Sequence, residues 1–342
     1  MPSRALFAMA ILAASVAGSA VSGEEPADAL RVFVTIPPAQ YVVDRIGGPH
    51  VATEVLVPPG QSPHSFDVTP RQMVTLVESR AYFAIGLPFE REIIERIESL
   101  SSQLTIVDMG RGVPRRRLIE HGSEGGSDEP EGSASTHEHG APPGPVDTRD
   151  RQGHAEEEPG GTDPHIWLAP ALLKLQAKNV FEALAELDPE HAAEYGGNLD
   201  RLIDDLDALD AEIAEALAPI RGRAVYVFHP AFGYLTDAYG LEQVAVEIGG
   251  SEPGPRGLAR LIERAKGDGV RVIFVQPQFA SSSAEAVARA IGGAVVPIDP
   301  LAYDCAANLR TMASRIRAAL LPEDPGERDE REDPVDAGKS SD

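Results

Sequence analysis

The sequence predicts an α/β fold of two lobes, each with a central, mostly parallel four-stranded sheet flanked by helices. Short β-branched and apolar runs alternate with amphipathic helical segments, which is typical of parallel strands joined by crossover helices. The alternation occurs twice, once in residues 30–107 and again in residues 224–320. Between the two halves, apolar residues recur at spacings of three and four, which indicates one long helix. We therefore expect a long rigid helix to join the two lobes.

Strands and helices alternate strictly in the first half. Pro37 and Pro38 follow the first strand, and we expect them to end it in a loop. Thr69 precedes Pro70, and this pair predicts a helix start with an N-cap and a proline in the first turn. The expected elements are a strand at 30–35, a helix at 41–46, a strand at 51–57, a helix at 69–79, a strand at 82–85, a helix at 89–100 and a strand at 104–107.

A helical pattern begins after residue 170 and continues for about fifty residues. Its first part is predicted at 171–187, and Asp188-Pro189 restarts it. A helix over 189–218 would be ~45 Å long at ~1.5 Å per residue, which is more than one small lobe needs. Gly196 and Gly197 inside it could bend it or mark a second start. A helical hairpin packed on one lobe and a strut between two lobes both fit, and we favour the strut.

The second half repeats the alternation of the first. Its third strand is apolar except for Arg271, as expected for a largely buried parallel strand. The expected elements are a strand at 224–228, a helix at 231–239, a strand at 244–248, a helix at 258–266, a strand at 270–275, a helix at 284–291, a strand at 295–298 and a helix at 303–320.

The N-terminus is typical of a secretory signal. Arg4 precedes an apolar run at 6–16, and small residues follow. The run is too short to span a bilayer, which needs ~20 apolar residues. We therefore expect a soluble periplasmic or secreted protein. Its segments would be a signal peptide at 1–23, an N-terminal lobe at 24–187 with a disordered insert at about 111–162, a linking helix at 188–220, a C-terminal lobe at 221–320 and a disordered acidic tail at 321–342.

The formal charge of −24 is unevenly distributed. Residues 120–161 hold eleven acidic and two basic residues, and residues 321–342 hold nine acidic and three basic ones. The remainder is only mildly acidic, which argues against nucleic acid as a partner. Cys305 is the only cysteine, so an internal disulfide is excluded and no lipid-attachment cysteine follows the apolar run. We expect Cys305 to be a buried apolar residue.

The insert at 111–162 is rich in Gly, Pro, Ser and Glu. Such a composition cannot offset its chain entropy by apolar burial, so we expect disorder. Histidines spread through it could bind metal weakly together with its carboxylates, and a plain solvated insertion explains the composition equally well. These possible accessory ligands are His121, His137, His139 and His154.

Four candidate metal ligands lie in loops near strand ends. His229 and Asp299 each follow a predicted strand directly. His64 follows another strand by one Pro/Gly loop, and His165 ends the N-terminal half. Ligands of open α/β sheets bind beyond the carboxyl ends of the strands, so these side chains are expected to meet.

Three imidazoles and one carboxylate form a four-coordinate set that suits zinc. A proline beside each candidate restricts the backbone. Taken alone, each histidine could be a loop residue bonded to the backbone, and the joint placement favours a metal site. His50 and His191 lack such a setting and are expected at the surface. Trp167 is expected to pack in the core.

Four motifs contain the candidate ligands. They are Gly-Gln-Ser-Pro-His-Ser-Phe at 60–66, Asp-Pro-His-Ile-Trp-Leu at 163–168, Phe-His-Pro-Ala-Phe at 228–232 and Ile-Asp-Pro-Leu at 298–301. In this order they resemble the metal-binding solute-binding proteins of ABC transporters, in particular the zinc-uptake branch. The resemblance covers roughly residues 30–320 without the insert.

The resemblance implies one zinc ion in the cleft between the lobes, with His64, His165, His229 and Asp299 at the ligand positions. It implies capture of zinc in the periplasm, delivery to a membrane permease and no catalysis, and we expect a monomer. Pro63 stands where some members carry a carboxylate, so either Asp299 or a water must be the fourth ligand. The insert holds fewer histidines than the loops of many zinc members.

Other functions remain as alternatives. A manganese or iron carrier of the same family is the nearest, although manganese members usually place a carboxylate where His229 stands, and nitrogen ligands suit zinc and later metals. A secreted zinc hydrolase would need an open water site and a general base, for which Glu247 or Glu252 could serve. No His-Glu-x-x-His motif is present. A metal-bearing adhesin is a weaker alternative.

Overall fold

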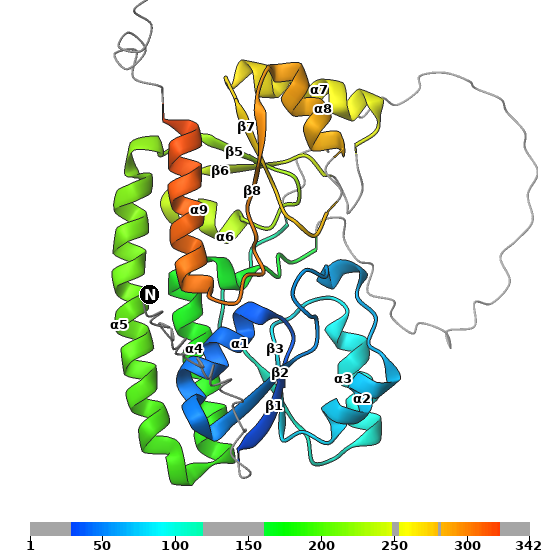
Figure 1. The fold of residues 1–342 in the computed structure, drawn as a ribbon, viewed down its shortest axis with the longest axis vertical. Coiled ribbons are helices and arrows are strands. Elements are labelled where there is room, and N and C mark those ends of the chain that lie inside the picture. The colour runs from blue at the N-terminus through cyan, green and yellow to red at the C-terminus, as the bar shows by residue number, and fades with distance from the viewer. Residues whose placement is uncertain (1–28, 119–160, 248–252, 280–281, 322–342) are drawn as a thin grey trace, which may run out of the picture.

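The computed structural model describes residues 29–118, 161–247, 253–279 and 282–321. Figure 1 shows two lobes, one above the other, and the green helix α5 (Ala192–Leu217) running along both. The predicted fold class is confirmed. The proposed signal peptide, the four insert histidines and almost all of the proposed tail lie outside the described residues. In the part of the chain that the structure describes, no helix is both long and apolar enough to cross a bilayer.

The sheet of the N-terminal lobe is parallel throughout, in the order β2-β1-β3-β4. Val32 of the central strand β1 lies opposite Thr53 of β2 and Ala81 of β3. Strand β3 is buried throughout and β1 is buried from Val32 to Val34, which agrees with the apolar runs in their sequences. The strands are β1 (Leu30–Val34), β2 (Val51–Val55), β3 (Ala81–Ala84) and β4 (Thr105–Asp108).

Helices cover both faces of this sheet. The predicted start of the first helix is wrong, because the helix begins at Pro37 rather than at Tyr41. Pro37 and Pro38 occupy its first turn, where a missing N–H costs no hydrogen bond. Thr69 caps the second helix in a capping box with Gln72, as its sequence predicts in part. The helices are α1 (Pro37–Gly47), α2 (Pro70–Val77), α3 (Glu90–Leu100) and α4 (Pro170–Leu187).

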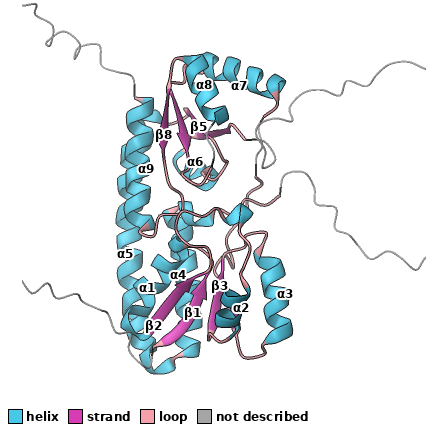
Figure 2. Cartoon of the chain, turned by 45° about the vertical axis from the view of Figure 1, so that its right-hand side comes forward, coloured by secondary structure: helices cyan, strands magenta, loops and turns pink. Residues whose placement is uncertain are grey.

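The C-terminal lobe repeats the strand order of the first, as β6-β5-β7-β8, again all parallel. Its strands are β5 (Ala224–Val227), β6 (Glu242–Ala245), β7 (Val272–Val275) and β8 (Ala294–Pro297). Its helices are α6 (Gly233–Tyr239), α7 (Pro255–Gly267), α8 (Ser282–Ile291) and α9 (Cys305–Leu320). Figure 2 shows α9 beside α5, with the two sheets on the same side of this helical layer.

The long helix α5 contacts both lobes. Near its start, Asn198 donates to the carbonyl of Ile46 at the end of α1, at 2.7 Å. Near its end, Asp210 accepts from Tyr239 of α6 at 2.7 Å. Its 26 residues span ~39 Å at ~1.5 Å per residue. The prediction that a long helix joins the two lobes is therefore confirmed. Helix α4 packs antiparallel along α5, so the alternative, a helical hairpin, is present as well.

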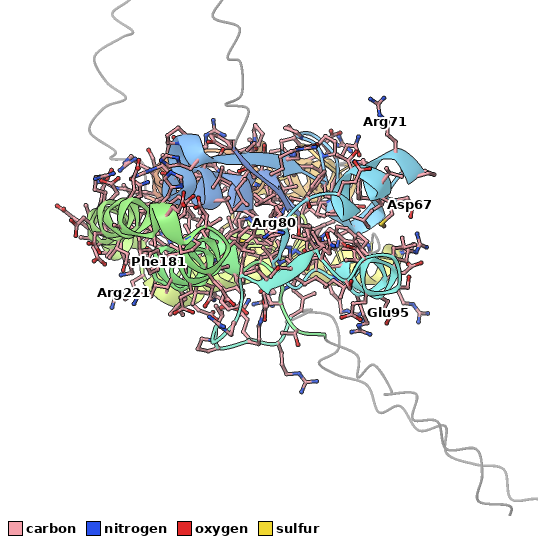
Figure 3. All side chains as sticks on the ribbon, turned by 90° about the horizontal axis from the view of Figure 1, so that it is seen from below. Asp67, Arg71, Arg80, Glu95, Phe181 and Arg221 are labelled. Atoms are coloured by element: carbon pink, nitrogen blue, oxygen red, sulfur yellow. The ribbon has the colours of Figure 1, made fainter. Side chains whose placement is uncertain are left out.

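Gly196 and Gly197 do not interrupt α5, which is one helix through both. A Cβ at Gly196 would lie 3.7 Å from the ring of Phe181 on α4, so the glycine lies at the contact of the two helices. Phe181 is labelled in Figure 3, beside the green helices α4 and α5. The space at Gly196 would also accept an alanine, and burial of the apolar face of α5 offsets the ~1 kcal/mol by which glycine disfavours a helix.

One apolar cluster passes continuously through both lobes. It contains Val32 of β1, Leu206 of α5, Val227 of β5 and Ile316 of α9. Cys305 belongs to it and is 2% exposed, as predicted, and burial raises the pKa of its thiol. Separate clusters fill the other face of each sheet, under α3 in one lobe and α8 in the other. Because the main core is shared, it fixes the two lobes relative to each other.

The structure differs from the expected disorder at both flanks of the predicted insert. Arg117 and Thr162 form an antiparallel bridge, and the N–H of Leu118 donates to the carbonyl of Gly161 at 2.8 Å. Asp163 N–H donates to the carbonyl of Arg116 at 3.0 Å. These pairings order the two flanks against each other, and residues 119–160 between them lie outside the described part.

Candidate metal centre

Three histidines from three distant segments converge between the lobes. Their nearest ring nitrogens all lie within 4.8 Å of one another. His64 lies in the short helix η2 (Pro63–Ser65) after β2, His165 immediately precedes η3 (Ile166–Leu168), and His229 follows β5. The carboxyl ends of β2 and β5 therefore face the same point, where α/β sheets commonly hold ligands. His165 and His229 are 4% and 6% exposed, and His64 is the exposed member.

A buried carboxylate fixes the orientation of His165. The Nδ1 of His165 lies 2.7 Å from Oδ1 of Asp163, and the backbone N–H of His165 donates to the same oxygen at 3.0 Å. An ionised carboxylate only accepts hydrogen bonds, so the imidazole proton lies on Nδ1 and the lone pair on Nε2. Burial would raise the pKa of Asp163, but hydrogen bonds from His165 and Arg116 outweigh it and hold this pKa below its usual value. Burial lowers the pKa of His165.

His229 is held in the same way by Glu247. Its Nδ1 lies 3.0 Å from Oε2 of this carboxylate, which is 5% exposed. The side-chain amide of Gln276 also clamps its backbone, accepting from the N–H of His229 at 3.2 Å and donating to its carbonyl at 2.8 Å. Phe279 stacks on the ring with centroids 4.8 Å apart. The proton of His229 therefore also lies on Nδ1, with the lone pair on Nε2.

The two Nε2 atoms face each other at 3.4 Å. Since both carry lone pairs, neither can donate to the other, and the two lone pairs point at a common position. A cation placed there would bind both. Neutral imidazole nitrogens oriented by carboxylates are typical ligands of zinc and other late divalent metals.

His64 completes the cluster from the solvent side. Its ring centroid lies 4.5 Å from that of His229 and 6.0 Å from that of His165. The Ser62 hydroxyl accepts from the N–H of His64 and caps the short helix η2 at its start. Loss of hydration, together with His229 and His165, lowers the pKa of His64 to about 3. The ring is therefore neutral, and able to bind a cation, at neutral pH.

Asp299 is the one predicted ligand that the structure does not bring into this group. Among the described residues, the metal-compatible cluster contains the three histidines alone. The Oδ1 atom of Asp299 instead accepts from Nε2 of Gln278 at 2.7 Å and from the N–H of Leu301 at 2.9 Å. The carboxylate thus organises the loop between β8 and α9.

The remaining predicted residues lie apart from the cluster or outside the described chain. His50 and His191 stack on each other at 3.7 Å, next to the start of α5. Trp167 is 2% exposed, and its Nε1 donates to the carbonyl of Pro300 at 2.7 Å, so it packs in the core as expected. Glu252 lies outside the described residues.

Sequence reasoning did not assign the groups that orient the ligands. Asp163 precedes His165 by two residues, and this Asp-Pro-His spacing could have suggested a carboxylate partner. Glu247 follows β6, and the sequence alone indicates no role for it beyond that of a possible general base. Gln276 follows β7 and carries no local signal, because an amide that clamps a distant backbone is recognisable only in the folded chain.

Comparison with known proteins places the chain in a family. The ZnuA family, described as zinc-uptake complex component A, periplasmic, matches residues 32–319. Among its relatives is the high-affinity zinc uptake system protein ZnuA of Paracoccus denitrificans, 29% identical over 243 residues, which cover 70% of this chain and 72% of that protein.

Two solved structures extend this similarity. A crystal structure of ZnuA is 33% identical, with a TM-score of 0.74, and the match covers 86% of this chain and 100% of that chain. A ZnuA variant with an internal deletion, solved with zinc bound, is 32% identical with a TM-score of 0.72, covering 87% and 100%. The present chain belongs to the ZnuA family of periplasmic metal-binding solute-binding proteins.

Proposed function

We propose that this protein captures zinc with high affinity in the periplasm and delivers it to the membrane permease of an ABC transporter. This proposal rests mainly on the convergence of His64, His165 and His229. Two of these imidazoles are fixed as neutral ligands by the carboxylates of Asp163 and Glu247. The zinc-uptake description of the family and the zinc-bound ZnuA structure support this assignment.

The three histidines would supply three nitrogen ligands, and a water would occupy the fourth position of a tetrahedral zinc ion. Asp299 is the alternative fourth ligand. To reach the metal, its Oδ1 would have to give up the hydrogen bonds from Gln278 and Leu301. Since these bonds also order the loop before α9, water is the simpler fourth ligand.

The donor set favours zinc over manganese or iron. Zinc binds imidazole more tightly than manganese(II) or iron(II) at a comparable site, and manganese prefers carboxylate-rich sites. Manganese members of the family usually carry a carboxylate at the position of His229. The histidine at this position leaves the site with one carboxylate fewer than theirs. A manganese or iron carrier of the same family is the second candidate, because the carboxylate of Asp299 could join the site.

The chain acts by binding rather than by catalysis, as its membership of a solute-binding family indicates. Glu247, the described candidate for a hydrolytic base, is 5% exposed and hydrogen-bonded to His229. This engagement argues against a hydrolase.

Metal competition tests the proposed function. Purified metal-free protein would be titrated with zinc, manganese(II) and anaerobic iron(II), alone and in competition. We expect one equivalent of zinc to bind tightly and to displace either of the other ions. Tighter binding of manganese or iron would assign the protein to the second candidate function. A variant with His191→Ala is a matched control, because this histidine lies outside the cluster, and it should bind zinc like the natural protein.

A further inference from the structure

A largely buried arginine lies directly behind His165. The side chain of Arg116 is 14% exposed, and its Nη1 donates to Oδ2 of Asp163 at 2.9 Å. The other oxygen of this carboxylate, Oδ1, accepts from Nδ1 and from the backbone N–H of His165. Asp163 is fully buried, so Arg116 and His165 together satisfy a carboxylate that has no access to water.

The same arginine reaches into the C-terminal lobe. Its Nε lies 2.9 Å from Oδ2 of Asp237 on α6, and its guanidinium carbon lies 5.7 Å from the ring centre of Tyr234. The backbone N–H of Arg116 donates to the Tyr234 hydroxyl at 3.2 Å, and this hydroxyl donates to the carbonyl of Asp163 at 3.1 Å. Helix α6 thus contacts Asp163 directly through Tyr234 and indirectly through Asp237, which pairs with Arg116.

A glycine leaves room for this arrangement. A Cβ built at Gly233, the first residue of α6, would lie 1.2 Å from Nη1 of Arg116 and 2.9 Å from Oδ2 of Asp163. No side chain at this position could coexist with the guanidinium where it lies. The glycine at position 233 in the C-terminal lobe therefore leaves the space that the guanidinium of Arg116, from the N-terminal lobe, occupies.

We propose that Arg116 is a positioning residue of the metal site, which fixes Asp163, and through it the Nδ1–H tautomer and ring orientation of His165, to helix α6 of the C-terminal lobe. This inference rests on the proposed function of metal capture. Helix α6 begins four residues after His229, so the contact would hold His165 and His229 in one frame. Groups that orient metal-binding histidines typically change metal affinity about 10–100-fold when removed.

The test uses the full chain with Arg116→Ala, Arg116→Lys and Gly233→Ala. Arg116→Ala should weaken zinc binding about 10-fold or more. Arg116→Lys keeps a cation beside Asp163 but cannot pair with both carboxylates, so its loss should be smaller. Gly233→Ala keeps every charged group but displaces the guanidinium and crowds Oδ2 of Asp163, so it should reproduce the loss. Arg111→Ala is the matched control, because Arg111 lies in the same segment and pairs with Glu182 and Asn179 of α4 instead.

A second readout separates positioning from general stability. Two-dimensional ¹H–¹⁵N spectra of the metal-free protein should show the protected Nδ1–H of His165 in the natural protein and in Arg111→Ala. This signal should weaken or vanish in Arg116→Ala and Gly233→Ala, while circular dichroism shows the fold retained. An unchanged His165 signal with unchanged zinc affinity in both variants would overturn the inference. Failure of the natural protein to bind zinc would instead overturn the proposed function, and the metal-free spectra would still decide the role of Arg116.

Discussion

At the scale of single residues, the metal site depends on where each imidazole proton lies. Asp163 and Glu247 hold the protons of His165 and His229 on Nδ1, which directs both Nε2 lone pairs to one position. The carboxylates therefore prepare the ligands before any metal arrives. A ligand that is already oriented and neutral has little conformational entropy left to lose on binding.

Replacing His165 with alanine tests its role as a ligand. We expect zinc affinity to fall by more than about 100-fold, because loss of a ligand should exceed the 10–100-fold typical of its orienting partners. Isothermal titration with a competing chelator would measure this change. Circular dichroism of the variant should retain the natural helix content. Zinc affinity within a few-fold of the natural value would show that His165 is not a ligand.

The protons released on zinc binding provide a pH-dependent prediction. Zinc displaces protons only from imidazoles that are charged in the free protein. The pKa of His64 is lowered to about 3, so its ring is neutral before zinc binds at pH 6, and the lowered pKa of His165 favours its neutral form as well. Binding at that pH should release fewer than two protons, whereas three histidines titrating near 6.5 would release more than about two.

Calorimetry in buffers of different ionisation enthalpy measures this proton release directly. Affinity should correspondingly fall only weakly between pH 7 and pH 6 and more steeply in more acidic solution. Release of two or more protons at pH 6 would contradict the lowered pKa values of His64 and His165.

The candidate ligands could be predicted from the sequence because each lies beside a strand end or a distinctive proline motif. His64, His165 and His229 meet as that placement suggests. The engagement of Asp299 by Gln278 could not be foreseen, since it depends on how two loops of the C-terminal lobe fold together.

At the scale of elements, local patterns predicted most helices and strands, and the errors have local causes. A proline after a strand can either lie in a loop or occupy the first turn of a helix. Pro37 does the latter, since α1 begins three residues after the last residue of β1. Burial of the apolar face of α5 outweighs the low helix propensity of Gly196 and Gly197. The propensities of single residues do not reveal this burial.

The apolar stripe of α5 should carry much of the stability of the protein. Leu206 is 1% exposed and belongs to the core shared by both lobes. Leu206→Ala should lower the free energy of unfolding by about 2–5 kcal/mol, the usual range for such a cavity. Urea denaturation followed by circular dichroism would measure it. Asp204→Ala, an exposed change on the same helix, should have almost no effect, and an equal loss in both variants would contradict this assignment.

At the scale of the whole molecule, the two-lobed architecture followed from repetition of the same alternation on either side of one long helix. The contacts that join the lobes did not follow from the sequence. Trp167 with Pro300, and Arg116 with Asp237, pair residues more than one hundred positions apart. Nothing in the local sequence marks such pairs, because they depend on the packing of α5, α6 and α9 into one unit.

The insert provides the last prediction, which concerns the whole chain. The flanks of residues 119–160 are already paired, since the N–H of Leu118 donates to the carbonyl of Gly161 at 2.8 Å. Replacing residues 119–160 with Asn-Gly would close these flanks as a two-residue hairpin, a favoured connection for antiparallel pairs. None of the three clustered histidines lies in the removed segment. Tight zinc affinity should therefore change by no more than about threefold, since the shortened protein keeps all three histidines.

Titration of both proteins with zinc to several equivalents would also show what the insert contributes. If its histidines and carboxylates bind zinc weakly, the natural protein should take up additional equivalents that the shortened protein does not. Identical stoichiometry would identify the insert as a segment without a metal role. Loss of the tight equivalent in the shortened protein would contradict a site built from His64, His165 and His229, since it would require a ligand from the removed segment.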